Sequence, residues 1–288
     1  MIHLPGLTMK NPLMPASGTF GYGQGYTKQY DLNQLGALVT KSTTLAPKTG
    51  NSGTIYADGP ASTLNAVGLT NPGMQAVIDD KLPWLATHYP ELPIIVSIAG
   101  ESVAEYQQLA QTISQQPHVA AIEVNISCPN VERGGMSFGI DPEQAERVTR
   151  AVKRVSKVPI YVKLSPNVTS LVTIAQAVIA GGADGLSMIN TLMAMRFDLK
   201  TGDPILGHIT GGLSGPAILP IALNAVYQVR QMTDLPIIGM GGVNSGQDAY
   251  EMMLAGADAV AVGSANYYRE RAIPAIAEEL ALQQRKVS

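Results

Sequence analysis

The sequence predicts an α/β fold, a single (β/α)8 TIM barrel with long loops on its C-terminal face. Short apolar segments alternate with segments of helical periodicity, and the alternation repeats eight times along the chain. Most apolar segments have no polar face, as expected of strands that helices cover. A length of 288 residues suits one barrel, so residues 1–288 are expected to form one domain. An open doubly wound sheet is the alternative, but eight repeats favour closure.

The predicted elements follow the chain from end to end. The strands cover residues 13–16, 37–40, 94–98, 120–126, 160–164, 185–189, 237–240 and 259–262. Helices are expected over residues 102–114, 142–155, 170–180, 217–232, 246–254 and 273–284, and weaker patterns favour helices over 25–33 and 73–82. Gly182 and Gly256 each follow a helix and precede a buried strand, which is typical of glycine at a helix C-terminus.

Three connections are much longer than a barrel needs. Residues 43–71, 127–140 and 191–216 are rich in small and polar residues, and each follows the C-terminal end of a strand. Long loops without secondary structure are commonly functional. Because active sites of barrels lie on the C-terminal face, the sequence predicts its chemistry there.

Composition excludes several functions. Charged residues make up 14% of the chain, against about 25% in an average domain, which suggests extensive burial and at least a dimer. A net charge of −3 without a basic block argues against nucleic acid as a partner. No segment approaches the roughly 20 apolar residues of a membrane span, and the first residues do not resemble a signal peptide. One cysteine cannot form an internal disulfide, so a cytoplasmic protein is expected.

Polar and small residues gather where the predicted strands end. Lys41 and Lys163 directly follow apolar strand residues, and a cation at such a position needs an anionic partner. Asn125 and Asn190 suit a planar ligand with amide edges. Solvated lysines and turn-forming asparagines are the alternative interpretation. The full set at the strand ends is Ser17, Lys41, Ser42, Ser97, Asn125, Cys128, Lys163, Asn190, Thr191, Gly241, Gly242, Gly263 and Ser264.

Two glycine-containing strand ends indicate a phosphate site. Gly241-Gly242 ends the seventh strand and Gly263-Ser264 the eighth, where barrels commonly bind phosphate through backbone N–H groups. Glycine lets the backbone approach the anion closely. The four histidines lack the spacing of metal ligands, so no metal site is expected.

Several longer motifs resemble those of one known family. They are residues 125–131 (NISCPNV), 161–168 (YVKLSPNV), 188–192 (MINTL), 209–216 (ITGGLSGP) and 238–243 (IGMGGV). Together with residues 4–7, 15–18 and 261–266 they closely resemble the class 1 dihydroorotate dehydrogenases over almost the whole chain. The segment 131–135 (VERGG) is similar to the NAD-linked B-type branch of that family.

The resemblance implies an FMN-binding barrel that oxidises dihydroorotate to orotate in de novo pyrimidine (UMP) biosynthesis, with FMN accepting the hydride. It implies Cys128 as the base, on a loop that closes over the substrate, and Lys163 as a cation beside the flavin. The implied substrate-binding residues are Lys41, Asn65, Gly68, Leu69, Asn125, Asn130, Asn190 and Thr191. The implied cofactor-binding residues are Ser17, Lys41, Ser42, Ser97, Asn125, Lys163, Ile189, Gly215, Gly241, Gly242, Gly263 and Ser264.

The B-type resemblance also implies partners. Enzymes of that branch pass electrons to NAD through a second subunit that carries FAD and an iron–sulfur cluster, in a heterotetramer built on a homodimer. A single cysteine cannot hold such a cluster, so it would belong to the partner. The chain departs from the family pattern at Ser97 and His208, where asparagine is usual.

Three alternatives remain open at this point. A homodimer could perform the same oxidation with fumarate as the acceptor. A sugar-phosphate lyase or isomerase would use Lys163 as a Schiff-base amine and would be colourless. A non-catalytic flavin-binding subunit would hold FMN that dihydroorotate does not bleach.

Overall fold

Eight parallel strands form the centre of the molecule. The computed structural model describes residues 1–127, 129–130 and 136–287. Within these residues the strands of the main sheet are β3 (Leu13–Pro15), β4 (Leu38–Val39), β7 (Ile94–Ile98), β8 (Val119–Asn125), β11 (Ile160–Lys163), β12 (Gly185–Met188), β15 (Ile237–Met240) and β16 (Ala259–Val262). Each lies within one residue of a predicted strand at either end, so the strand assignment is confirmed.

The sheet curls into a nearly closed barrel. Its order is β3-β16-β15-β12-β11-β8-β7-β4, and every adjacent pair is parallel. The two edge strands approach each other, because the Gly36 backbone N–H, just before β4, donates to the Leu13 carbonyl of β3 at 2.8 Å. The predicted fold class is therefore confirmed.

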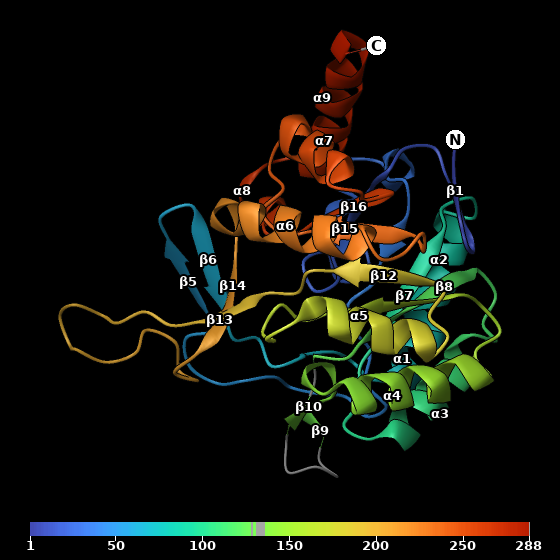
Figure 1. The fold of residues 1–288 in the computed structure, drawn as a ribbon, viewed down its shortest axis with the longest axis horizontal. Helices are drawn as coiled ribbons and strands as arrows, with labels where there is room; N and C mark the ends of the chain where they lie inside the picture. The colour runs from blue at the N-terminus through green and yellow to red at the C-terminus, as the bar shows by residue number, and fades with distance from the viewer. Residues whose placement is uncertain (128, 131–135, 288) are drawn as a thin grey trace.

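Helices surround the barrel (Figure 1), and most of them match the predicted ranges. They are α3 (Val103–Ile113), α4 (Pro142–Val155), α5 (Leu171–Ala180), α6 (Leu219–Arg230), α7 (Gly246–Leu254) and α9 (Ala272–Val287). Ser102, Asp141, Ser170 and Ser245 begin α3, α4, α5 and α7, and each side chain accepts a hydrogen bond from a backbone N–H of the first turn. Such caps stabilise helix starts by about 1 kcal/mol each.

The two weaker helix predictions had different outcomes. The one over residues 73–82 is confirmed and extended by α1 (Met74–Ala76), the π-helical turn η3 (Val77–Lys81) and α2 (Leu82–His88). The one over residues 25–33 is wrong: that stretch holds the short 3₁₀ turns η1 (Gln24–Tyr26) and η2 (Leu32–Gln34). Asp31 interrupts it, because its extended backbone and its side-chain bond to the Asn33 N–H start a separate turn.

Two of the long loops contain a second sheet, which corrects the expectation that they lack structure. The segment 43–71 supplies β5 (Tyr56–Gly59) and β6 (Ser62–Asn65), and the segment 191–216 supplies β13 (Leu192–Ala194) and β14 (Gly211–Ser214). They form an antiparallel sheet in the order β13-β14-β6-β5. In Figure 1 this sheet lies on the side toward which β12 points, which is the C-terminal face of the barrel. The third loop contributes β9 (Pro129–Asn130), β10 (Met136–Ser137) and the turn η5 (Phe138–Ile140).

A short hairpin covers the opposite end of the barrel. The strands β1 (Ile2–Leu4) and β2 (Leu7–Met9) pair with each other, and β1 lies far from the second sheet (Figure 1). Leu7 and Met9 are buried against the lower barrel interior, and the Tyr161 hydroxyl donates to the Pro5 carbonyl at 2.9 Å. No helix in the described part of the chain is long and apolar enough to cross a membrane.

Alternation along each strand separates two packing regions. On β11, Ile160 and Val162 join the large cluster under the helices, whereas Tyr161 belongs to the cluster inside the barrel. The next residue of the inward set is Lys163, because side chains on a strand alternate between its two faces. The barrel interior thus changes from aromatic to charged within one strand.

Candidate active site

A cavity of about 520 Å³ lies at the C-terminal ends of the barrel strands. This volume is within the range of sites that hold small molecules and cofactors. Most of the predicted site residues line it, namely Ser17, Lys41, Ser42, Asn65, Gly68, Leu69, Asn125, Lys163, Ile189, Asn190, Thr191, Gly215, Gly241, Gly242, Gly263 and Ser264. The fold therefore brings together residues that are far apart in the sequence.

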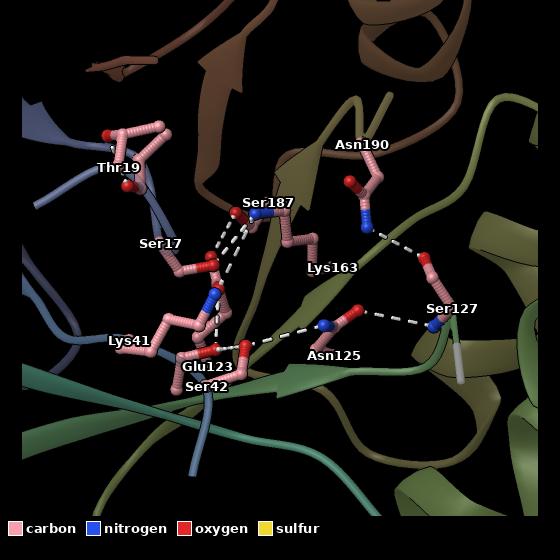
Figure 2. A network of polar contacts seen from close by, with 12 residues as sticks. Ser17, Thr19, Lys41, Ser42, Glu123, Asn125, Ser127, Lys163, Ser187 and Asn190 are labelled. Atoms are coloured by element: carbon pink, nitrogen blue, oxygen red, sulfur yellow. Dashed lines mark hydrogen bonds and ion pairs between the residues drawn. The ribbon is translucent and has the colours of Figure 1, made fainter. Parts of the chain in front are cut away.

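A buried ion pair lies under the cavity. Lys163 at the end of β11 is 4% exposed, and its Nζ lies 3.8 Å from Oε1 of Glu123 on β8. The same ammonium group donates to the Ser17 hydroxyl at 3.0 Å. Figure 2 shows these contacts converging from β8, β11 and the loop after β3. The sequence required an anionic partner for this lysine, and Glu123 is that partner.

Lys41 is placed differently from Lys163. It follows β4 and lines the cavity, but no hydrogen bond or ion pair from the described residues reaches its ammonium group. Burial lowers the pKa of Lys41 from its ordinary value, and the positive charge of Lys163 lowers it further. Lys41 and Lys163 thus share this region with the buried carboxylate of Glu123, and this excess of positive charge favours an anionic ligand.

Asparagine and serine side chains form a hydrogen-bonded row along one wall (Figure 2). Asn190 Nδ2 donates to Ser127 Oγ at 2.9 Å. The Ser127 backbone N–H donates to Asn125 Oδ1 at 3.2 Å, and Asn125 Nδ2 points to Ser42 Oγ at 3.4 Å. The Asn190 N–H is itself held by the Leu164 carbonyl at 2.9 Å. These contacts fix the orientation of both amide groups before any ligand arrives.

Backbone lines the opposite end of the cavity. Gly241 and Gly242 follow β15 with φ of 122° and 81°, a region that residues with a side chain rarely adopt. A Cβ at Gly242 would lie 2.5 Å from the backbone nitrogen of Leu219, the first residue of α6. Gly263 and Ser264 follow β16 and precede the short helix α8 (Ala265–Tyr268). This arrangement presents N–H groups without side chains, which suits a phosphate.

The second sheet forms the outer wall. Asn65 at the end of β6 donates from Nδ2 to the Gly212 carbonyl of β14 at 3.2 Å, so the two long loops hold each other in place. The Tyr268 hydroxyl contacts both Asp58 and Thr63, which ties the hairpin β5–β6 to α8. The phosphate-type end of the cavity and its outer wall are therefore directly connected.

Of the other predicted residues, only Ser97 is described with its side chain, and it does not line the cavity. Ser97 on β7 is fully buried below it and bonds to Ser42 Oγ at 2.8 Å and to Glu123 Oε1 at 2.9 Å. Cys128 lies outside the described residues. Asn130 is described only as part of β9, where it pairs with Met136.

Sequence reasoning missed several residues of the site. Glu123 stands inside an apolar strand instead of at its end, and its spacing of two from Asn125 is the signal that places both on one face. Lys48 and Glu101 form an ion pair in the cavity wall, and Tyr267 also contributes to the lining. No local pattern marks these three, because loops bring them together. Within the described residues no group of three or more metal-binding side chains is found.

The motifs and the geometry agree with a comparison against known families. The sequence model of the family described as dihydroorotate dehydrogenase matches residues 1–283. The chain belongs to the dihydroorotate dehydrogenase family. It is therefore an enzyme of that family, and the family resemblance read from its motifs is confirmed.

Individual relatives divide between two branches. A dihydroorotate dehydrogenase A (fumarate) from Lacticaseibacillus paracasei is 68% identical over 280 residues, covering 97% of this chain and 96% of the relative. Catalytic subunits of dihydroorotate dehydrogenase B (NAD(+)) from Anoxybacillus flavithermus and Latilactobacillus sakei are each 55% identical over 279 residues, covering 97% of this chain and 89% and 91% of the relatives. The B-type assignment made from residues 131–135 is therefore not confirmed.

Proposed function

We propose that the chain oxidises dihydroorotate to orotate in pyrimidine biosynthesis, with FMN bound in the barrel cavity. The observation that carries this proposal is the pair of lysines above one buried carboxylate. Lys163 is held by Glu123 and Ser17, whereas no carboxylate in the described part of the chain forms an ion pair with Lys41. A cavity with this charge suits an anionic substrate and a cofactor that gains negative charge when reduced.

The residues present fit FMN. Gly241, Gly242, Gly263 and Ser264 offer backbone N–H groups for its phosphate at one end of the cavity. Ser17, Ser42, Asn125 and Lys163 lie on the floor where the ring system would rest, and Ile189 and Gly215 complete the lining. Ser97 would act there through Ser42. When bound, FMN supplies the acceptor for the hydride that leaves the substrate.

The protein's own groups would bind and orient the pyrimidine. Lys41 would pair with the substrate carboxylate, and Asn65, Asn125 and Asn190 would hydrogen-bond its amide edges. Gly68, Leu69 and Thr191 line the same part of the cavity, and Asn130 is proposed to join them. Cys128, on the loop after β8, is proposed to take the proton from the substrate carbon next to the one that loses the hydride. A thiolate is needed for that step.

The electron acceptor separates two candidates. The segment 131–135 and the B-type relatives support NAD, reached through a partner subunit that carries FAD and an iron–sulfur cluster, on a homodimer of this chain. The relative that is 68% identical carries the name of the fumarate-dependent enzyme, and this favours direct reoxidation by fumarate.

Anaerobic mixing of the purified protein with dihydroorotate tests the proposed function. A yellow protein that loses its flavin absorbance supports it. A colourless protein would instead favour the sugar-phosphate lyase or isomerase, and bound FMN that dihydroorotate does not bleach would favour the non-catalytic subunit. Either outcome rejects the proposal.

The reduced protein then distinguishes the acceptors. Fumarate or NAD is added to it under anaerobic conditions, and the return of flavin absorbance is followed. Rapid reoxidation by fumarate would reject the NAD-linked candidate. If neither compound reoxidises the isolated chain, an electron-transfer partner is required, and copurification from the source cell identifies whether it carries FAD and iron.

A further inference from the structure

Glu123 lies beneath the cavity, where it touches no ligand-accessible space. It is 2% exposed and sits in the middle of β8. Its two carboxylate oxygens accept hydrogen bonds from Ser97 Oγ at 2.9 Å and from Ser187 Oγ at 2.8 Å. Ser97 lies on the adjacent strand β7, and Ser187 lies on β12, beyond β11. Both serines are fully buried. Glu123 is thus a fixed negative charge inside the barrel.

The first partner of this charge is Lys163. The 3.8 Å separation of Nζ and Oε1 is an ion-pair distance, and both side chains are excluded from water. A buried charge that loses its partner is strongly unfavourable, so the carboxylate restrains where the ammonium group can lie. It also halves the positive charge that Lys41 and Lys163 would otherwise place under a ligand.

Glu123 also acts on Asn125, through the hydroxyl groups of Ser97 and Ser42. Ser97 uses its proton to bond Glu123, so the 2.8 Å contact between Ser97 and Ser42 requires Ser42 to donate. Ser42 Oγ is then left as the acceptor for Asn125 Nδ2 at 3.4 Å. The charge on Glu123 therefore fixes the direction of each bond up to Asn125. The Ser127 backbone N–H holds the oxygen of the same amide at 3.2 Å, so Ser42 completes the pair of contacts that positions Asn125.

We propose that Glu123 is a positioning residue that acts on both halves of the site, on Lys163 by direct pairing and on Asn125 through Ser97 and Ser42. This inference rests on the proposed function, because the two target residues are those assigned to flavin and substrate. It gives Ser97 a role in relaying hydrogen-bond direction, in place of a direct cofactor contact. Ser187 shares the carboxylate but has no link to Ser42 in the described contacts.

The role of the Glu123 charge is tested with the variants Glu123→Gln and Glu123→Asp, each purified with FMN bound. Glu123→Gln removes a negative charge from beneath the cavity, so the more positive cavity favours the reduced, anionic flavin. We expect reduced flavin to gain about tenfold over oxidised flavin, which raises the two-electron potential by about 30 mV. Glu123→Asp retains the charge and is expected to keep the parent potential. Equal potentials in the parent and Glu123→Gln would overturn the proposal.

The hydroxyl row is tested with a matched pair of variants. Ser97→Ala and Ser187→Ala each remove one hydrogen bond to Glu123, so we expect similar losses of melting temperature in the cofactor-free protein. Only Ser97→Ala also breaks the path to Asn125, and we expect its KM for dihydroorotate to rise about fivefold, the effect of one misdirected hydrogen bond. The KM of Ser187→Ala should stay within about twofold of the parent. Equal KM values for the two variants would reject the proposed action of Glu123 on Asn125 through Ser97.

Failure of this inference is distinguishable from failure of the proposed function. If the parent protein binds no FMN, or its flavin is not bleached by dihydroorotate, the proposed function fails first. If the parent is bleached and Glu123→Gln keeps the potential of the parent, only the positioning role of Glu123 is rejected.

Discussion

The lower and upper halves of the barrel interior are built on the same strands but have opposite chemistry. Tyr161 and Lys163 are two residues apart on β11, which is about 7 Å along a strand. Tyr161 is surrounded by apolar side chains, whereas Lys163 meets a carboxylate and hydroxyl groups. The lower set includes Met14, Ala37, Val39, Ile95, Ala121, Tyr161, Ile238, Ala259 and Ala261.

This difference indicates that the lower half stabilises the fold and that the upper half serves binding and reaction. Apolar burial in the lower half stabilises the fold directly. The upper half removes an ammonium and a carboxylate from water, and such a pair often contributes no net stability compared with apolar residues. A charged layer that brings no stability is explained by what it does for a ligand. Substitutions below should therefore affect folding, and substitutions above should affect binding and reaction.

Tyr161→Ala is the strongest test of this division between the two halves, because it should affect stability and leave the reaction unchanged. The ring is fully buried, and Gly185 on the neighbouring strand leaves space for it: a Cβ there would lie 2.4 Å from Tyr161 Cε1. Removing the ring should lower the free energy of unfolding by about 3–5 kcal/mol, measured by urea denaturation. The fraction that remains folded should be bleached by dihydroorotate at the parent rate.

Tyr161→Phe is the matched control for that change. It keeps the ring and loses the hydrogen bond to the Pro5 carbonyl, so the expected loss is about 1 kcal/mol. A large fall in the bleaching rate of folded Tyr161→Ala or Tyr161→Phe would show that the lower half takes part in the chemistry.

Cys128→Ala should produce the largest effect on reaction alone. The residue is proposed as the base, and general base catalysis contributes about 100-fold or more to proton abstraction. The variant should retain FMN and melt at the parent temperature, but its flavin should be reduced by dihydroorotate at least about 100-fold more slowly in stopped-flow experiments. Reduction at the parent rate would mean that another group removes the proton.

Gly242→Ala tests whether the backbone at the phosphate-type end of the cavity binds FMN. The added Cβ would meet the Leu219 nitrogen at 2.5 Å, so the loop after β15 must shift and FMN affinity should fall by about tenfold or more. Gly202→Ala is the control, because Gly202 also has a positive φ of 78° but has nothing within 4 Å of the added atom. FMN affinity is measured by fluorescence quenching of the cofactor-free protein. Equal losses in both variants would point to backbone strain instead of lost phosphate contacts.

The sequence was informative where structure is local. Strands such as Ala259–Val262 are continuous apolar runs, and strand ends mark the cavity, which is why Lys41, Asn125 and Asn190 could be placed in one site. The second sheet could not be foreseen, because β6 pairs with β14 about 150 residues later and neither strand is strongly apolar. Long-range pairing leaves no trace in a local pattern.

Glu123 was overlooked for a different reason. A site defined by strand ends excludes residues inside a strand, and Glu123 is two positions before the end of β8. The period-two alternation that places it beside Lys163 was present in the sequence. Its hydrogen bonds to Ser97 and Ser187, however, depend on the register of three strand pairs, β7–β8, β8–β11 and β11–β12. The role of Ser97 changed with it, from a cavity position to one beneath the cavity.

The smallest expected effect is a pH dependence of orotate affinity that is due to Lys41. Burial and the charge of Lys163 lower the pKa of Lys41 below its ordinary 10.5. The cation proposed to bind the substrate carboxylate is therefore fully present below that lowered pKa and is lost as the pH rises through it. Affinity for orotate, measured by flavin absorbance changes, should fall by up to about tenfold over this range, the contribution of one charged hydrogen bond.

Lys41→Arg tests that interpretation, because a guanidinium group keeps its charge throughout the same pH range. Each protein is compared with its own affinity at neutral pH, so a change in side-chain shape cancels. The parent should lose affinity at alkaline pH and Lys41→Arg should not. If both lose it equally, the titrating group is another one, and Lys41 does not carry the charge that the upper half of the barrel presents to the substrate.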